Sequence, residues 1–350
     1  MGDGVSGDDG TTVRKLRIAE VARHASVSPA TVSRVLNGNA QVGEAKRKRV
    51  LDAIAELDYR PNPLARSLRK QRSTMIGVIV ADIGNAYFGS AIRAVENAAF
   101  KEGYRVLVCN TDESATKQEA YLQALEEERV LGVIISPSNP DSPGATRLLD
   151  RGIPLVALDR AVSDPRADAV LPDNVNGART ATQLLLDSGY RDIGILAGPL
   201  STEIAAERLA GYAVAMRAAG LEPHTIEGGF RSEVAYEAVI RLLDQSALPA
   251  ALLVSNNLMM LGALKAVREA GLRVPDDLAV VGIGDPEWAA LIDPPLTMMA
   301  VPVRSMALDA MELLLQRVLR SRDSPRRIIH PMELRVRASH KRFLGSSLGI

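Results

Sequence analysis

Residues 25–38 read A-S-V-S-P-A-T-V-S-R-V-L-N-G, and this stretch decides the fold of the N-terminal part of the chain. Ser28 and Pro29 open a helix, because a hydroxyl suits the N-cap and a proline loses no hydrogen bond at the first helical position. An apolar face follows at Val32, Val35 and Leu36 with helical spacing. The stretch therefore predicts a short amphipathic helix that begins a few residues after a preceding helix.

Two further helical patterns flank this stretch. Ile18, Val21, Ala22 and Ala25 repeat at helical spacing before it, and the residues that do so after it are Val50, Ile54 and Leu57. Three amphipathic helices with short connections predict one small core within residues 16–60. This is helix-turn-helix geometry, in which the second helix lies in the major groove of DNA and its N-terminal residues face base edges.

The charge distribution agrees with a DNA-binding segment. The chain has 350 residues and a net charge of zero, but residues 11–74 hold 14 Lys/Arg and 5 Asp/Glu, a net of +9. Residues 75–350 hold 28 Lys/Arg and 34 Asp/Glu, a net of −6. Positive charge gathered in one small segment is expected of a module that binds phosphates, although a solvated basic helix would give the same count. The helix-turn-helix pattern in the same segment favours the phosphate-binding module over the solvated helix.

The stretch at 25–38, with its continuation V-L-D-A-I-A-E-L-D-Y-R-P-N-P-L-A-R-S-L at 50–68, closely resembles the headpiece of the lactose/galactose-repressor family. The resemblance implies a sequence-specific DNA-binding transcriptional regulator that acts as a repressor. It implies base-reading roles for Pro29, Ala30 and Arg34. Of these, Arg34 is the natural bidentate reader of a guanine. The phosphate-contacting or helix-orienting residues that it implies are Ser28, Thr31, Ser33 and Asn37.

Two positions depart from the family pattern. Ser26 stands where the turn usually has glycine, and Gly43 stands where the third helix usually has a serine cap. Both departures are expected to lower stability and to leave DNA binding intact.

Residues 61–74 are expected to form a hinge helix and linker. Pro61 and Pro63 stop the preceding helix, and two turns of helix without a partner are marginal in water. The family resemblance implies that paired hinge helices of a dimer enter the minor groove, where Leu68 wedges into the central base step between the contacts of Arg66 and Arg69. The alternative is that Leu68 is an ordinary linker residue.

From Met75 onward, short apolar runs alternate with helices expected at 88–103, 116–129 and 143–151, and a second such series begins at I-G-I-L-A-G, residues 193–198. Apolar strands separated by helices predict parallel sheets covered on both faces. The expected fold is an all-α headpiece followed by an α/β two-lobed domain. The family resemblance implies a periplasmic-binding-protein-like pair of lobes within 75–345. Lobe 1 covers about 75–172 and 303–331, and lobe 2 about 173–302 and 332–345.

A cleft between such lobes is the expected site for a small-molecule effector, because ligands bind beyond the carboxyl ends of parallel strands. The candidate residues follow strands or offer hydrogen bonds, charge or flat rings. They are Asn85, Tyr87, Phe88, Asp159, Arg208, Phe230, Asn256, Asn257 and Asp285. Each could instead cap a loop or fill a core, Phe88 above all.

The candidate effector site departs from the family in its acidic groups. Asn256-Asn257 replaces the usual Asn-Asp, and Gly282-Ile283-Gly284-Asp285 replaces Gly-Phe-Asp-Asp, so two acids that commonly hold effectors are missing. Ala206 stands where some sugar-responsive relatives have arginine. A sugar, a less polar metabolite and no ligand at all remain open.

The expected mechanism is that of a homodimer on a pseudo-palindromic operator. An effector in the cleft would change the angle between the lobes and with it the spacing of the hinge helices. Inducer and corepressor both stay open. We expect no cofactor, no metal and no membrane contact, and no intramolecular disulfide, since Cys109 is the single cysteine.

Two other classes of protein are disfavoured. An enzyme would need a catalytic set, but no catalytic or metal-ligand motif occurs and the histidines His24, His224, His330 and His340 are scattered. A solute-binding protein of a transporter would share the sensor, but it needs a secretion signal and has no use for the headpiece. Residues 1–15 are expected to be a disordered leader, and the protein is expected to be cytoplasmic.

Overall fold

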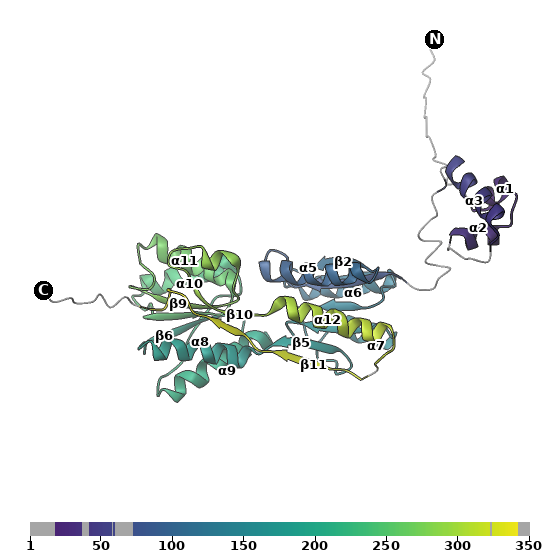
Figure 1. Cartoon of the computed structure of the whole chain (residues 1–350). Helices are drawn as coiled ribbons and strands as arrows, with labels where there is room; N and C mark the ends of the chain where they lie inside the picture. The colour runs from purple at the N-terminus through teal and green to yellow at the C-terminus, as the bar shows by residue number, and fades with distance from the viewer. Residues whose placement is uncertain (1–17, 37–41, 58, 60–72, 323, 342–350) are drawn as a thin grey trace, which may run out of the picture. The chain divides into compact units, whose positions relative to one another are not determined.

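The computed structural model describes residues 18–36, 42–57, 59, 73–322 and 324–341. The chain divides into two compact units between Ser73 and Thr74. The first is the headpiece, drawn in purple in Figure 1, and the second carries two α/β lobes. The expected leader, and the expected hinge apart from Ser73 and Thr74, lie outside the described residues.

The headpiece is built from α1 (Ile18–His24), α2 (Pro29–Leu36) and α3 (Glu44–Glu56). Ser28 caps α2, since the Thr31 backbone N–H donates to the Ser28 hydroxyl oxygen at 3.2 Å. The apolar faces of the three helices pack into one core, as the sequence predicts. The buried members of that core are Val21, Ala22, Ala25, Val32, Val35, Val42, Val50 and Ala53.

The structure shows what the two unusual headpiece residues do. Ser26 adopts a φ of 53°, in the left-handed region where glycine is unstrained. Gly43 is the N-cap of α3 and offers no side-chain hydrogen bond to the first turn. Each costs the headpiece a stabilising feature that glycine or serine would supply at the same position.

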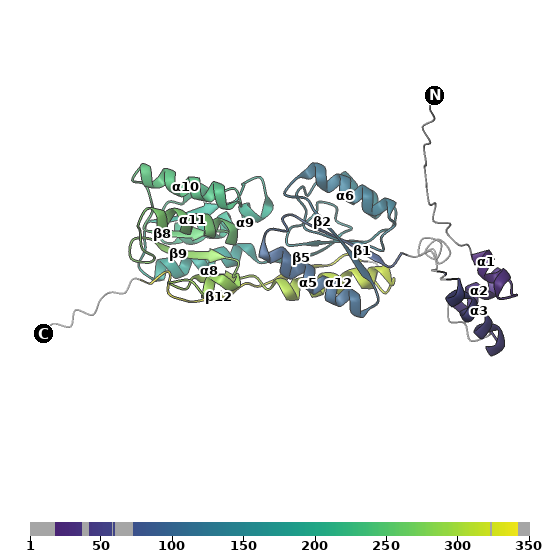
Figure 2. The ribbon, with the colours of Figure 1, turned by 90° about the horizontal axis from the view of Figure 1, so that it is seen from above.

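Lobe 1 is a six-stranded parallel sheet in the order β11-β5-β4-β3-β1-β2. Helices α5 and α12 cover one face and α6 and α7 the other. Figure 2 shows α5 and α12 on one side of this sheet and α6 on the other. The elements are β1 (Met75–Val80), α5 (Ala86–Lys101), β2 (Arg105–Asn110), α6 (Ala115–Glu127), β3 (Val133–Ile135), α7 (Pro143–Asp150), β4 (Leu155–Leu158), β5 (Asp168–Pro172), α12 (Val303–Val318) and β11 (Arg327–His330).

Lobe 2 has a six-stranded sheet in the order β12-β10-β9-β8-β6-β7, parallel except for β12 at its edge. Helices α8 and α9 cover one face and α10 and α11 the other. The elements are α8 (Asn174–Asp187), β6 (Ile193–Ala197), α9 (Glu203–Ala218), β7 (His224–Glu227), α10 (Ser232–Asp244), β8 (Ala251–Val254), α11 (Asn257–Glu269), β9 (Ala279–Ile283), the 3-10 helix η1 (Glu287–Ala290), β10 (Thr297–Ala300) and β12 (Glu333–Arg335).

The chain passes between the lobes three times: from β5 to α8, from β10 to α12 and from β11 to β12. The strands that feed these crossovers lie at one side of each sheet, β11 and β5 in lobe 1 and β12 and β10 in lobe 2. The opposite edges are β2 and β7. The loops that follow β2 and β7 therefore lie far from the crossovers.

Candidate functional site

The exposed face of α2 carries the candidate DNA contacts that the structure describes. Val32 and Val35 turn into the headpiece core, whereas Ser28, Pro29, Ala30 and Arg34 are exposed and Thr31 and Ser33 are half-buried. This leaves the N-terminal end of the helix and the Arg34 guanidinium free to face a partner. The other candidates, Asn37, Arg66, Leu68 and Arg69, lie outside the described residues.

The second unit holds a cavity of about 540 Å³ between its lobes, within the range of small-molecule sites. Its lining comes from the segments after β1, β2, β4, β7, β8, β9 and β10, at the carboxyl ends of both sheets, and from the first two turns of α9. Every effector candidate named from the sequence lines this cavity: Asn85, Tyr87, Phe88, Asp159, Arg208, Phe230, Asn256, Asn257 and Asp285. Whether each contacts a ligand stays a prediction.

The three asparagines have structural partners. Asn85 caps α5 by accepting the Tyr87 N–H at 3.0 Å. Asn256 caps α11 by accepting the Met259 N–H at 2.7 Å. Asn257 then joins the lobes, because its side-chain amide donates to the Asn85 side-chain oxygen at 3.0 Å. These residues shape the cavity and leave only part of their hydrogen-bonding capacity to it.

Asp285 is held by the edge strand of lobe 2. Arg337 donates to both of its carboxylate oxygens, at 2.7 and 2.8 Å, and Arg335 donates to one at 2.9 Å. Burial pushes the pKa of this carboxyl up, but the hydrogen bonds and charges of the two arginines outweigh burial and lower the pKa. Asp285 therefore holds the loop that leads into η1, and the two arginines neutralise its negative charge.

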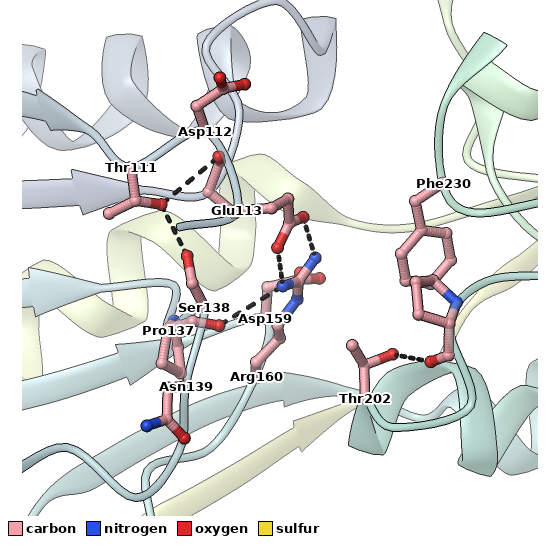
Figure 3. Close-up of polar contacts among 12 residues, drawn as sticks. Thr111, Asp112, Glu113, Pro137, Ser138, Asn139, Asp159, Arg160, Thr202 and Phe230 are labelled. Atoms are coloured by element: carbon pink, nitrogen blue, oxygen red, sulfur yellow. Dashed lines mark hydrogen bonds and ion pairs between the residues drawn. The ribbon is translucent and has the colours of Figure 1, made fainter. Parts of the chain in front are cut away.

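Arg160 is a lining residue that the sequence analysis missed. Its guanidinium makes a bidentate ion pair with the Glu113 carboxylate, at 2.6 and 2.7 Å, and its charged carbon lies 5.9 Å from the centre of the Phe230 ring on the other lobe (Figure 3). Burial lowers the pKa of Arg160, but the bonds to Glu113 outweigh burial and raise it. Its place directly after Asp159, at the end of β4, was a signal that could have found it.

Tyr87, Asp159 and Arg208 form a buried polar group at the floor of the cavity. Burial, with a contribution from Asp159, raises the pKa of Tyr87 well above its usual value. Burial also raises the pKa of Asp159, and it lowers the pKa of Arg208. Each charged form is therefore less stable here than in water.

Two lining residues sit in strained backbone. Asp159 has a φ of 73° and Phe230 a φ of 59°, both in the left-handed region that favours glycine. Strain of this kind persists where surrounding structure enforces it, and it concentrates at binding sites. Here it directs the Asp159 carboxylate and the Phe230 ring toward the cavity from opposite lobes.

Metal-ligand clusters and membrane helices are not found among the residues that the structure describes. No group of three or more His, Cys, Asp or Glu side chains there could hold a metal ion. Within the same residues, no helix is both long and apolar enough to cross a bilayer.

Two family models match the chain. The model of bacterial regulatory proteins, lacI family, matches residues 17–62, and the model of a periplasmic binding protein-like domain matches residues 182–340. The first match covers α1–α3 and the second covers most of lobe 2. The second match also includes α12 and β11 of lobe 1, and neither match includes β1 to β5.

Curated relatives match over nearly their full length. The HTH-type transcriptional repressor PurR of Aliivibrio salmonicida is 34% identical over 330 residues, which is 93% of this chain and 99% of that protein. PurR of Escherichia fergusonii is 37% identical over 321 residues, 90% of this chain and 94% of that protein. The similarity thus includes the headpiece and both lobes.

Solved structures agree with this comparison. A Lac repressor dimer bound to operator and the anti-inducer ONPF is 29% identical, with a TM-score of 0.82 over 94% of this chain and 100% of that chain. The complex of the transcriptional regulator CelR with cellobiose is 31% identical, with a TM-score of 0.69 over 93% of this chain and 99% of that chain. Both resemble this chain across the headpiece and the two lobes.

Proposed function

The chain belongs to the lacI family of bacterial regulatory proteins, and from this premise we propose that it is a transcriptional repressor whose affinity for operator DNA responds to a small effector in the cleft between its lobes. The observation that carries the proposal is the match to repressors over 99% of a relative's length, headpiece included. A solute-binding protein would share the lobes but not this headpiece.

The proposed DNA contact is made by α2. Arg34 donates two hydrogen bonds to a guanine in the major groove, Pro29 and Ala30 offer apolar contact, and Ser28, Thr31 and Ser33 orient the helix or meet phosphates. Asn37, Arg66, Leu68 and Arg69 extend this contact toward the hinge. Support comes from the exposure of Arg34 and of the N-terminal end of α2.

In this proposal the protein acts as a homodimer, like the Lac repressor dimer that it resembles. The two headpieces of the dimer bind the two half-sites of a pseudo-palindromic operator. A ligand that binds one arrangement of the lobes more tightly than the other shifts the protein toward that arrangement and so changes its affinity for DNA. Such couplings are typically about 1–3 kcal/mol. The protein works by binding, without catalysis. Because DNA is its partner, we place its action in the cytoplasm.

The test is a selection of duplexes from a randomised library at low ionic strength, followed by affinity measurements on the winning sequence. We expect one preferred half-site. We also expect an affinity that falls by roughly 10³–10⁵ between about 50 and 200 mM salt if six to ten phosphates are contacted. An unselective chain, with and without metabolites present, would contradict the proposal.

A further inference from the structure

Three buried polar groups that line the cavity have hydrogen-bonding capacity that the protein uses only in part. The Tyr87 hydroxyl and the Arg160 Nε are buried, and neither has a hydrogen-bond partner of ordinary geometry among the described residues. The Asp159 carboxylate is buried as well, with the Tyr87 hydroxyl beside it and the Arg160 Nε at 3.9 Å. Buried polar groups usually have partners, so these groups point to a bound molecule that supplies them.

Asp159 and Arg208 face each other from different lobes. Asp159 follows β4 in lobe 1, whereas Arg208 lies on α9 in lobe 2, and each is 6% exposed. Arg208 donates its Nε to the Asn174 side chain at 2.9 Å and its Nη1 to the Ser255 carbonyl at 2.5 Å, which leaves Nη2 for the cavity. No ion pair joins Asp159 to Arg208 in the part of the chain that the structure describes. A buried acceptor and a buried donor therefore stand on opposite sides of a gap.

Two of the other charged residues near this gap have ion-pair partners. Glu113 balances Arg160, and two arginines of lobe 2 balance Asp285. The charges of Asp159 and Arg208 balance each other, and the two further carboxylates of the lining, Asp82 and Glu287, are half-buried and exposed, respectively. Much of the surrounding wall is apolar or flat, and it includes Ile204, Phe230, Leu258, Ile283 and Trp288.

Resting on the function proposed above, we propose that the effector is an uncharged, flat and mainly apolar molecule with one polar end that carries a hydrogen-bond donor beside an acceptor, as an amide or a lactam does. The donor binds the Asp159 carboxylate, and the acceptor receives hydrogen bonds from Arg208 and Tyr87. Because these anchors belong to different lobes, the bound molecule stabilises the closed arrangement of the cleft.

Other chemical classes meet specific penalties in this cavity. A sugar would place hydroxyls against the apolar wall without partners. An ammonium group at the acceptor position would lie beside Arg208, and a carboxylate at the donor position would lie beside Asp159. The polar end of the effector is therefore uncharged, and the rest of the molecule carries no polar group that would face the apolar wall.

Ligand-observed NMR on the full chain tests this with benzamide, N,N-dimethylbenzamide, benzoate, benzylamine and D-glucose as probes. We expect benzamide to bind with a Kd on the order of millimolar, as a ligand of this size can. The dimethyl compound lacks the N–H donors and should bind at least about tenfold more weakly. Benzoate, benzylamine and glucose should also be weaker than benzamide.

Asp159→Asn gives a second readout. The change removes the acceptor and leaves Arg208 unbalanced, so the affinity for benzamide should fall about tenfold while the preference moves toward benzoate. Glu287→Gln is the control, because Glu287 lines the same cavity from an exposed position and should not alter this preference. Urea unfolding of each variant checks that it is folded.

Three results would overturn the inference: no benzamide binding, glucose or benzylamine binding as well as benzamide, or an unchanged benzamide-to-benzoate ratio in Asp159→Asn. Failure of the proposed function gives a different result. In that case the probes bind as expected but the chain selects no duplex. A repressor with another effector class would instead select a duplex and reject benzamide.

Discussion

Arg34 is the single side chain on which base recognition should depend most. It lies exposed on α2, and its guanidinium can donate two hydrogen bonds to one guanine. Arg34→Ala should therefore cost about 1–3 kcal/mol of operator affinity and relax the base preference at one position of each half-site. Measuring binding to operators changed one base pair at a time checks this.

The control for Arg34 is Arg23, which is exposed on α1 and has no proposed base contact. Arg23→Ala should weaken binding to all duplexes by a similar factor, or not at all. If Arg34→Ala also lowered the affinity for all duplexes by the same factor, Arg34 would be a phosphate contact and the base-reading role would be wrong.

Asp159 should lower the stability of the unliganded protein. Burial raises the pKa of its carboxyl in the folded state, so folding favours the protonated form. The contribution of this group to stability is full below its unfolded pKa and is lost as the pH rises through the folded pKa. Asp159→Asn should therefore increase the free energy of unfolding at about pH 7, and the gain should shrink toward about pH 4.

Urea unfolding at several pH values measures this effect. A gain that was equal at every pH, or a loss at neutral pH, would show that the pairing of Asp159 with its arginines outweighs its burial. A stability gain together with weaker ligand binding would identify Asp159 as a residue kept for function at the expense of stability.

At the scale of elements, α8 and α9 pack through a glycine. A Cβ added at Gly211 would overlap the backbone carbonyl of Val175 in α8, and a backbone atom cannot move aside as a side chain can. Gly211→Ala should separate the two helices and destabilise lobe 2 by about 1–3 kcal/mol. Chemical denaturation of the full chain gives the value.

Gly89 is the matched control for Gly211. It lies on the exposed face of α5, and a Cβ there would meet no atom within 4 Å. Gly89→Ala should stabilise the protein by about 0.5–1 kcal/mol, because alanine loses less backbone entropy in a helix. Equal effects of the two substitutions would contradict the close packing of α8 on α9.

At the scale of the whole second unit, two loops far from the crossovers hold the lobes together. Asp112 follows β2 and Arg231 lies between β7 and α10, and their charged groups are 3.4 Å apart across the mouth of the cleft. If the two lobes rotate apart about the crossovers, the sheet edges at β2 and β7 move furthest because they lie opposite the crossovers. This ion pair, beside the Asn257–Asn85 hydrogen bond, should therefore break when the cleft opens.

Arg231→Ala should shift the unliganded protein toward the open arrangement. The pair is half exposed, so its contribution is at most about 1 kcal/mol and the population shift at most about fivefold. Distances between spin labels on Gln123→Cys and Glu237→Cys, which lie on exposed sites of different lobes, measure the opening. Arg241→Ala, on the exposed side of α10, is the control and should leave the distances unchanged. If the parent protein, Arg231→Ala and Arg241→Ala all gave the same distances, Arg231 would have no role in holding the lobes together.

Local patterns predicted much of the fold. The apolar runs that predict strands are residues 75–81, 104–110, 132–136, 154–158, 193–198, 250–255 and 278–283. They match β1, β2, β3, β4, β6, β8 and β9 to within one residue at each end. Helix α5 begins at Ala86 rather than at residue 88 because the Asn85 side chain caps it there. The pattern did not pick out β5, β7, β10, β11 and β12, although β5 and β10 are buried along their whole length. Strand β7 reads H-T-I-E and buries only Ile226, so its pairing with β6 makes it a strand.

The amino-acid sequence by itself determined the helix-turn-helix, the alternation of strands and helices, and the loops in which the cavity residues lie. These follow from local preferences: apolar periodicity, capping side chains and prolines. Only the tertiary structure decided which polar groups remain unpaired in the cavity. Arg335 and Arg337 neutralise Asp285 from about 50 residues away, and Glu113 binds Arg160 across 47 residues, while the Asp159 carboxylate has only a longer ion pair of 3.9 Å with the neighbouring Arg160. Such pairings depend on how two sheets place distant loops, and no local preference encodes them.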